Sequence, residues 1–136
     1  RLGYLIGNKK NINYVSKIRS GYETNTISSA IASFFIDHYN VIIKNITQVK
    51  KGLKYLKHKL EKFNIEYSGG KTGNYIFINL KNKKINSKVV RKLKQKKIYV
   101  RSGWPKPFDK GFCLSGSSEK NMKFFFSNFI KIFKSI

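Results

Sequence analysis

A continuous apolar stripe runs through residues 39–64 and constrains the fold more than any other feature of this chain. Its members recur at alternating spacings of four and three residues: Ile42, Ile46, Val49, Leu53, Leu56, Leu60 and Phe63. This spacing places them on one face of a single long helix, and most lysines of the stretch avoid that face. The pattern predicts a long helix packed on a domain core. A coiled coil and an exposed helix that binds a partner are the alternatives.

Three elements are expected before this helix. An apolar start followed by Gly7 favours a short strand, and Asn8 is expected to cap the helix after it. Asn25 or Thr26 is expected to cap a second helix, with its apolar side chains inside the protein. The three elements cover residues 1–6, 8–19 and 26–38.

The sequence after the long helix indicates strands that alternate with helices. The expected strands cover residues 65–68, 74–80, 98–101 and 112–115. Ser87 and Ser118 are expected to cap the two helices that lie between and after them. Alternation of this kind favours an α/β or α+β sandwich, with helices packed on a small sheet. A chain of 136 residues suits one such core.

The charge of the chain is strongly positive. Its 29 lysine and arginine residues oppose six acidic residues, for a formal net charge of +23. Such a charge raises the possibility of a basic nucleic-acid-binding module, which would lose affinity steeply with added salt. However, the lysines are spread along the whole chain, and the aromatic residues fall mostly on apolar stripes. We therefore interpret the charge as a solvated lysine surface.

The composition of the chain also excludes several kinds of structural or metal-binding site. No apolar run approaches the roughly 20 residues that a membrane span needs. Cys113 is the only cysteine, so an intrachain disulfide and a cysteine-rich metal site are excluded. His38 and His58 lie in expected helices without a second ligand nearby, and we expect no metal site.

Five short motifs follow one another along the chain. They are RLGYLIG (1–7), RSGYETN (19–25), GNYIF (73–77), IYVR (98–101) and GSSEKN (116–121). Each motif is weak alone, but their order and spacing together are specific. The chain resembles the C-terminal portion of class I/II aminotransferases, closest to the histidinol-phosphate aminotransferase-like group. The resemblance covers essentially the whole chain.

The resemblance implies the fold-type I transferase fold that binds pyridoxal 5'-phosphate. Residues 1–25 would end the large cofactor-binding domain, 26–64 would form connecting helices, and 65–136 would form the small C-terminal domain. The implied reaction transfers an amino group between an amino acid or amine, phosphate- or phosphonate-bearing ones included, and a 2-oxo acid. A decarboxylase of the same fold and cofactor is an alternative. The resemblance also implies a cytoplasmic homodimer, with neither a membrane nor a nucleic acid as partner.

The resemblance also assigns roles to individual residues. Arg1 would pair with the cofactor phosphate, a task that suits a planar guanidinium that is always charged. Arg101 would contact the anionic end of the substrate, with Tyr22, Asn25 and Asn74 as further substrate-binding candidates. For these last three, local packing, a helix cap and a turn are the structural alternatives. No catalytic residue is expected, because the Schiff-base lysine would lie upstream, and the chain alone is expected to be inactive.

One window departs from the family pattern. The family carries an arginine before the last helix for the substrate α-carboxylate, whereas residues 112–115 read FCLS and no arginine follows Arg101. A carboxylate without a bidentate partner would be held loosely. Either the substrate lacks an ordinary α-carboxylate, as an aminoalkyl phosphate or phosphonate does, or Lys106 or Lys110 replaces the arginine. A degenerate gene is the third explanation.

Overall fold

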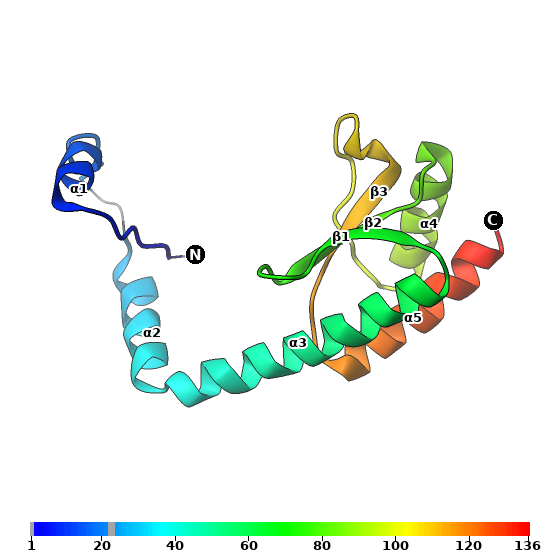
Figure 1. The fold of residues 1–136 in the computed structure, drawn as a ribbon, viewed down its shortest axis with the longest axis horizontal. Coiled ribbons are helices and arrows are strands. Elements are labelled where there is room, and N and C mark those ends of the chain that lie inside the picture. The colour runs from blue at the N-terminus through cyan, green and yellow to red at the C-terminus, as the bar shows by residue number, and fades with distance from the viewer. Residues whose placement is uncertain (1, 22–23) are drawn as a thin grey trace. The chain divides into compact units, whose positions relative to one another are not determined.

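The computed structural model describes residues 2–21 and 24–136, which belong to two compact units, residues 1–44 and 45–136 (Figure 1). The described elements are α1 (Lys9–Ser16), α2 (Thr26–Asp37), α3 (Tyr39–Lys62), β1 (Glu66–Gly69), β2 (Tyr75–Asn79), α4 (Lys83–Gln95), the 3-10 helix η1 (Phe108–Lys110), β3 (Gly111–Ser115) and α5 (Glu119–Lys134). None of the described helices is long and apolar enough to cross a membrane.

Two helices of the first unit begin at the predicted caps. The side-chain oxygen of Asn8 accepts a hydrogen bond from the Asn11 amide at 2.9 Å. The side-chain oxygen of Asn25 accepts one from the Ser28 amide at 2.7 Å. Each bond satisfies an amide that has no partner within its own helix, so both asparagines stabilise the helix start as expected.

The first unit also contradicts two expectations. Residues 2–8 form no strand, since no other described segment pairs with them, and the Tyr4 and Ile6 side chains are 90% and 84% exposed. The apolar side chains of α2, expected inside, are exposed as well: Ile27, Ile31, Phe34 and Phe35. Two short helices offer too little surface to cover an apolar face.

A three-stranded antiparallel sheet in the order β1-β2-β3 forms the centre of the second unit. Alternate residues of β2 and β3 point to one face and are buried there: Ile76, Ile78, Phe112 and Leu114. Buried side chains of α3, α4 and α5 complete this core, among them Leu56, Leu60, Leu93 and Phe129. Three helices therefore cover one face of the sheet, which confirms the predicted α+β sandwich (Figure 1).

The long helix and the last helix follow their predictions closely. α3 ends at Lys62, and Leu53, Leu56 and Leu60 of its stripe are buried, whereas Ile46 near its start is 41% exposed. The Ser118 hydroxyl caps α5 by accepting from the Asn121 amide. The stripe thus serves as a core-packing face over the second half of α3.

Two local predictions are wrong. Asn82 caps α4 by accepting from the Lys84 and Ile85 amides, while Ser87 lies inside the helix and donates to the Lys83 carbonyl. An asparagine and a serine five residues apart are both competent caps, and the earlier one begins the helix. Residues 98–101 form no strand, because Arg101 alone makes a bridge to the sheet.

α3 and the start of α5 approach each other closely at Gly52. A Cβ atom at this position would overlap the Ser117 carbonyl oxygen and lie 2.9 Å from the Ser118 carbonyl carbon. Both atoms belong to the backbone and cannot rotate away. The absence of a side chain at Gly52 therefore allows the two helices to share one core.

We predict that Gly52→Ala lowers the free energy of unfolding by about 1–3 kcal/mol, the usual cost of overpacking. Alanine is the better helix former by about 1 kcal/mol, so a net loss identifies the backbone overlap as the cause. Urea denaturation measures the change. Gly73→Ala is the control, because its Cβ meets only the Tyr75 ring at 3.4 Å. A Gly52→Ala chain as stable as the wild type would contradict the proposed contact.

Candidate active site

Arg101 is attached to the sheet by two backbone hydrogen bonds. Its amide donates to the Cys113 carbonyl at 3.0 Å, and its carbonyl accepts from the Cys113 amide at 2.7 Å. The neighbours of Cys113 on β3, Phe112 and Leu114, point into the core. Because side chains alternate along a strand, Cys113 and its bridge partner Arg101 point to the face that the helices leave open.

A cavity of about 610 Å³ lies on this open face. Its lining residues are Tyr75, Tyr99, Arg101, Trp104, Cys113, Leu114 and Ser115. Among these described residues, Arg101 carries the one full charge at neutral pH. Aromatic walls around one charged group and a few polar groups are typical of a small-molecule site. We call this cavity the Arg101 cavity.

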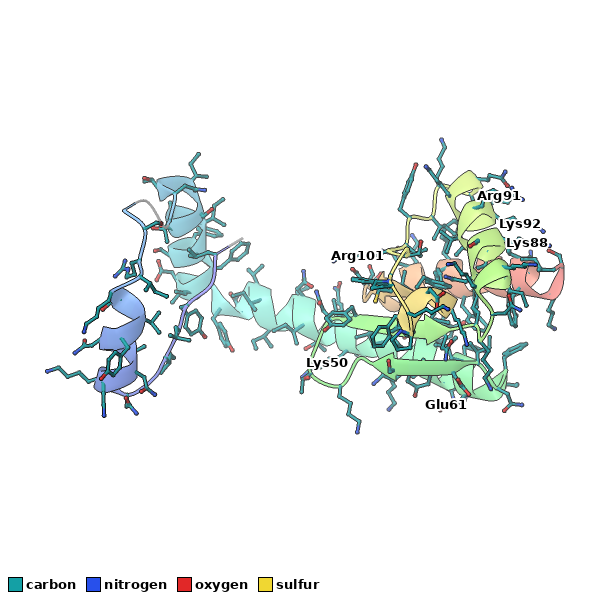
Figure 2. All side chains as sticks on the ribbon, turned by 90° about the horizontal axis from the view of Figure 1, so that it is seen from above. Lys50, Glu61, Lys88, Arg91, Lys92 and Arg101 are labelled. Carbon is teal, nitrogen blue, oxygen red and sulfur yellow. The ribbon has the colours of Figure 1, made fainter. Side chains whose placement is uncertain are left out.

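The Arg101 guanidinium stacks on the Trp104 ring, with its central carbon 4.4 Å from the ring centroid. Stacking orients the plane of the guanidinium and leaves its N–H groups free to donate within that plane. In the described part of the chain, no carboxylate forms an ion pair with Arg101. Figure 2 also shows Arg101 apart from the basic cluster of α4, labelled at Lys88, Arg91 and Lys92. Arg101 is thus positioned to bind an anion from outside the chain.

The loop that carries Trp104 is anchored to α4. The buried Asn86 side chain donates to the carbonyls of Asp109 and Gly111 at 3.2 and 2.9 Å. The Asp109 carboxylate lies 3.6 Å from the Lys83 ammonium. These contacts fix the end of the loop, so Trp104 presents its ring to Arg101 from an anchored segment.

Cys113 is the titratable neighbour of Arg101. Partial burial raises the pKa of its thiol above the ordinary value, and the positive charge of Arg101 opposes that rise. Burial is the larger effect, so the thiol is neutral at pH 7 and leaves the guanidinium unpaired. Cys113 therefore lines the cavity as a neutral group.

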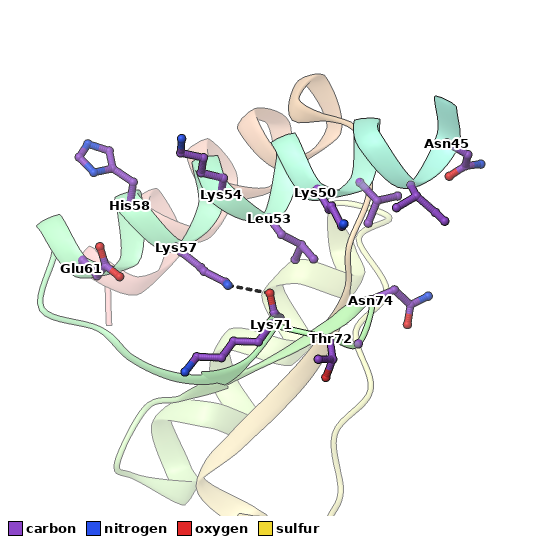
Figure 3. Close-up of a pocket in the computed structure, with 14 residues that line it drawn as sticks. Asn45, Lys50, Leu53, Lys54, Lys57, His58, Glu61, Lys71, Thr72 and Asn74 are labelled. Carbon is purple, nitrogen blue, oxygen red and sulfur yellow. Dashed lines mark hydrogen bonds between the residues drawn. The ribbon is translucent and has the colours of Figure 1, made fainter. Parts of the chain in front are cut away.

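The structure describes three of the five residues that the sequence predicts for the site. Arg1 and Tyr22 lie outside the described residues. Asn25 lies in the first unit, where its side-chain oxygen caps α2. Asn74 lines a different cavity, between α3 and the turn before β2, and not the Arg101 cavity (Figure 3). Arg101 is the candidate that lies in a cavity with aromatic walls.

Sequence reasoning missed the aromatic residues around Arg101. Tyr75 and Cys113 share the open face because strand residues alternate, a signal available in the pattern of the two expected strands. Trp104, the only tryptophan, follows Arg101 by three residues in an irregular loop. Neither Lys106 nor Lys110 lines the cavity. The described residues contain no group of three or more metal-ligating side chains.

Comparison with known proteins gives consistent matches. The model of the family described as aminotransferase class I and II matches residues 1–123. A histidinol-phosphate aminotransferase from Thermotoga neapolitana is 28% identical over 102 residues, which are 75% of this chain and 30% of that protein.

A solved structure shows the same fold. The histidinol-phosphate aminotransferase from Sinorhizobium meliloti, in complex with pyridoxal-5'-phosphate, matches 93% of this chain and 34% of its own, with a TM-score of 0.69 and 14% identity. The chain thus spans about a third of the length of both relatives.

We predict that the pH dependence of the alkylation rate of Cys113 changes when the charge of Arg101 is removed. The thiolate is the reactive form, so the iodoacetamide rate against pH follows the pKa of the thiol. Arg101→Gln removes the charge that lowers this pKa, and we expect the midpoint to move to higher pH and the rate at pH 8 to fall. Arg91→Gln, on α4, is the matched control and leaves the midpoint in place. An unchanged or lower midpoint in Arg101→Gln would contradict the geometry.

Proposed function

Because this chain belongs to the class I and II aminotransferase family, we propose that it supplies the C-terminal part of a pyridoxal-phosphate-dependent aminotransferase. The enzyme transfers an amino group between an amine or amino acid and a 2-oxo acid. The family match over residues 1–123 and the shared fold support this proposal. When bound, the cofactor supplies an electron sink for the carbanion at the amino carbon.

The Arg101 cavity is the observation that carries the proposal. A stacked guanidinium without a carboxylate partner in the described residues is a ready binding group for a phosphate or carboxylate of the substrate. The cavity fits the anionic end of a substrate rather than the whole cofactor. Its lining residues offer one cation and no carboxylate for the pyridine nitrogen.

We assign the remaining roles from the sequence motifs. Arg1 holds the cofactor phosphate, and the lysine that binds the cofactor lies upstream of it. Tyr22, Asn25 and Asn74 border the substrate. Residues 1–25 belong to the large domain, 26–64 to connecting helices and 65–136 to the small domain.

We further propose that the amino donor carries a phosphate or phosphonate and no α-carboxylate. In the window that lacks the family arginine, Phe112 and Leu114 are buried in the core. Arg101 therefore remains as the single cation of the cavity, which suits a substrate with one anionic group. The names of both relatives refer to histidinol phosphate, and an aminoalkyl phosphate of that kind meets the requirement.

The enzyme is proposed to work as a homodimer in the cytoplasm. The exposed apolar side chains of α2, such as Ile27 and Phe34, support burial against further protein. The lone Cys113, a free thiol, is consistent with a reducing compartment.

Two other functions are less well supported. For a nucleic-acid-binding module, the positive charge is the supporting observation, whereas the family match over residues 1–123 supports the aminotransferase. A decarboxylase of the same fold is distinguished by its product, carbon dioxide, which an aminotransferase does not release.

We predict that Arg101→Gln raises the KM for an aminoalkyl phosphate about 10- to 100-fold, the loss of a charge-assisted hydrogen bond. The assay uses the product of the whole coding sequence to which this chain belongs, with 2-oxoglutarate as acceptor. Lys88→Gln, which removes an equal charge from α4, is expected to leave the KM within about twofold. No amino transfer from any phosphorylated amine would contradict the proposed function, and an unchanged KM in Arg101→Gln would contradict the role of this arginine.

A further inference from the structure

We propose a second binding site, for a small organic anion with an apolar body, in the hollow between α3 and the hairpin of β1 and β2. The hollow has a volume of about 540 Å³. Its lining shares no residue with the Arg101 cavity. The proposal does not depend on the aminotransferase reaction, because it rests on the lysines and the apolar side chains of the lining, to which the reaction assigns no role. We call this hollow the lysine hollow.

Positive charge surrounds the lysine hollow. Figure 3 shows Lys50 and Lys57 pointing from α3 toward the hairpin, while Lys71 lies along the hairpin on the opposite side. Glu61 is the one acidic residue in the lining, and its carboxylate already accepts a hydrogen bond from the Tyr67 hydroxyl. Lys54 also belongs to the lining, so four ammonium groups against one engaged carboxylate leave an excess of positive charge. A concave surface focuses such a field on its interior.

The wall of the hollow is a fixed structure. The half-buried Lys57 ammonium donates to the Gly70 carbonyl at 2.6 Å and ties the hairpin turn to α3. Gly70 has a φ of +68°, and a Cβ there would lie 2.9 Å from the Lys57 Cε. The turn therefore depends on glycine both for its backbone and for its contact with Lys57.

Lys50 and Lys71 of the hollow are available to a ligand. In the described part of the chain, neither Lys50 nor Lys71 forms an ion pair or a hydrogen bond through its ammonium group. Thr72 adds a neutral hydrogen-bonding group at the turn. Each of the two ammonium groups can form a charge-assisted hydrogen bond with a phosphate or carboxylate that enters the hollow.

The apolar side chains of the hollow, which we call its floor, indicate that the ligand has an apolar part beside its anionic group. Ile46, Val49 and Leu53 of α3 form this floor, and Ile46 is 41% exposed. An inorganic ion would gain nothing from these apolar side chains, whereas a ring or a branched carbon chain would bury them. The site therefore suits an organic phosphate or carboxylate with an apolar body.

The test compares two probes, phenyl phosphate and inorganic phosphate, added to the 136-residue chain. Chemical-shift changes of the amides of residues 70–74 report the site. Salt at about 0.15 M screens general attraction between the charged chain and the anion. We expect phenyl phosphate to bind about fivefold or more tightly than inorganic phosphate, because it alone reaches the apolar floor. Equal affinity for the two probes, or no binding of either, would overturn the proposal.

Matched variants separate the site from the overall charge. The double variant Lys50→Gln with Lys71→Gln should lower the affinity for phenyl phosphate about tenfold, because charge-assisted contacts are lost. Lys88→Gln with Lys94→Gln removes the same charge from exposed positions of α4 and should change the affinity less than about twofold. A similar loss in both double variants would show attraction to net charge alone and would overturn the site.

A third variant tests the apolar floor. Ile46→Ser replaces a partly exposed side chain, so the fold is retained and the amide spectrum confirms it. We expect this variant to lose the preference for phenyl phosphate while its affinity for inorganic phosphate stays the same. A preference that survives the substitution would place the phenyl ring elsewhere and contradict the proposed orientation.

Discussion

The burial of one face of the three-stranded sheet determines where the functional groups of the second unit lie. Ile76, Phe112 and Leu114 point toward α3, α4 and α5, which cover that face. The residues next to them along each strand must point the other way, and this brings Tyr75 and Cys113 to the open face. Cys113 in turn positions Arg101 there through two backbone hydrogen bonds. The burial of one face of the sheet thus determines both which side chains form the core and which side chains line the Arg101 cavity on the other face.

The high positive charge of the chain does not by itself select one anion over another; selection depends on the shape and lining of the place where the anion binds. A net charge of +23 attracts any anion, and salt screens this attraction over roughly 10 Å. The Arg101 cavity adds aromatic walls and a guanidinium held by stacking on Trp104. The lysine hollow adds an apolar floor and a turn tied to α3 by Lys57. Both places combine positive charge with a concave, partly apolar lining.

The sequence predicts the features of this fold that depend on near neighbours. The caps at Asn25 and Ser118 and the length of α3 depend on residues within a turn or two, and the structure confirms them. The expected strand at residues 98–101 fails because Ile98 and Val100 pack against the core while Arg101 alone pairs with the sheet. The walls of the Arg101 cavity could not be predicted as a set, since they depend on a pairing across twelve residues.

The fluorescence of Trp104 tests the central claim, that the open face of the sheet binds anions through Arg101. Trp104 is the only tryptophan of the chain and stacks on Arg101, so its emission responds to an anion bound by this arginine. Titration with 2-aminoethyl phosphate, which does not absorb where tryptophan does, should produce a saturable change in emission that Arg101→Gln abolishes. An unchanged emission, or the same titration curve in Arg101→Gln, would contradict the account.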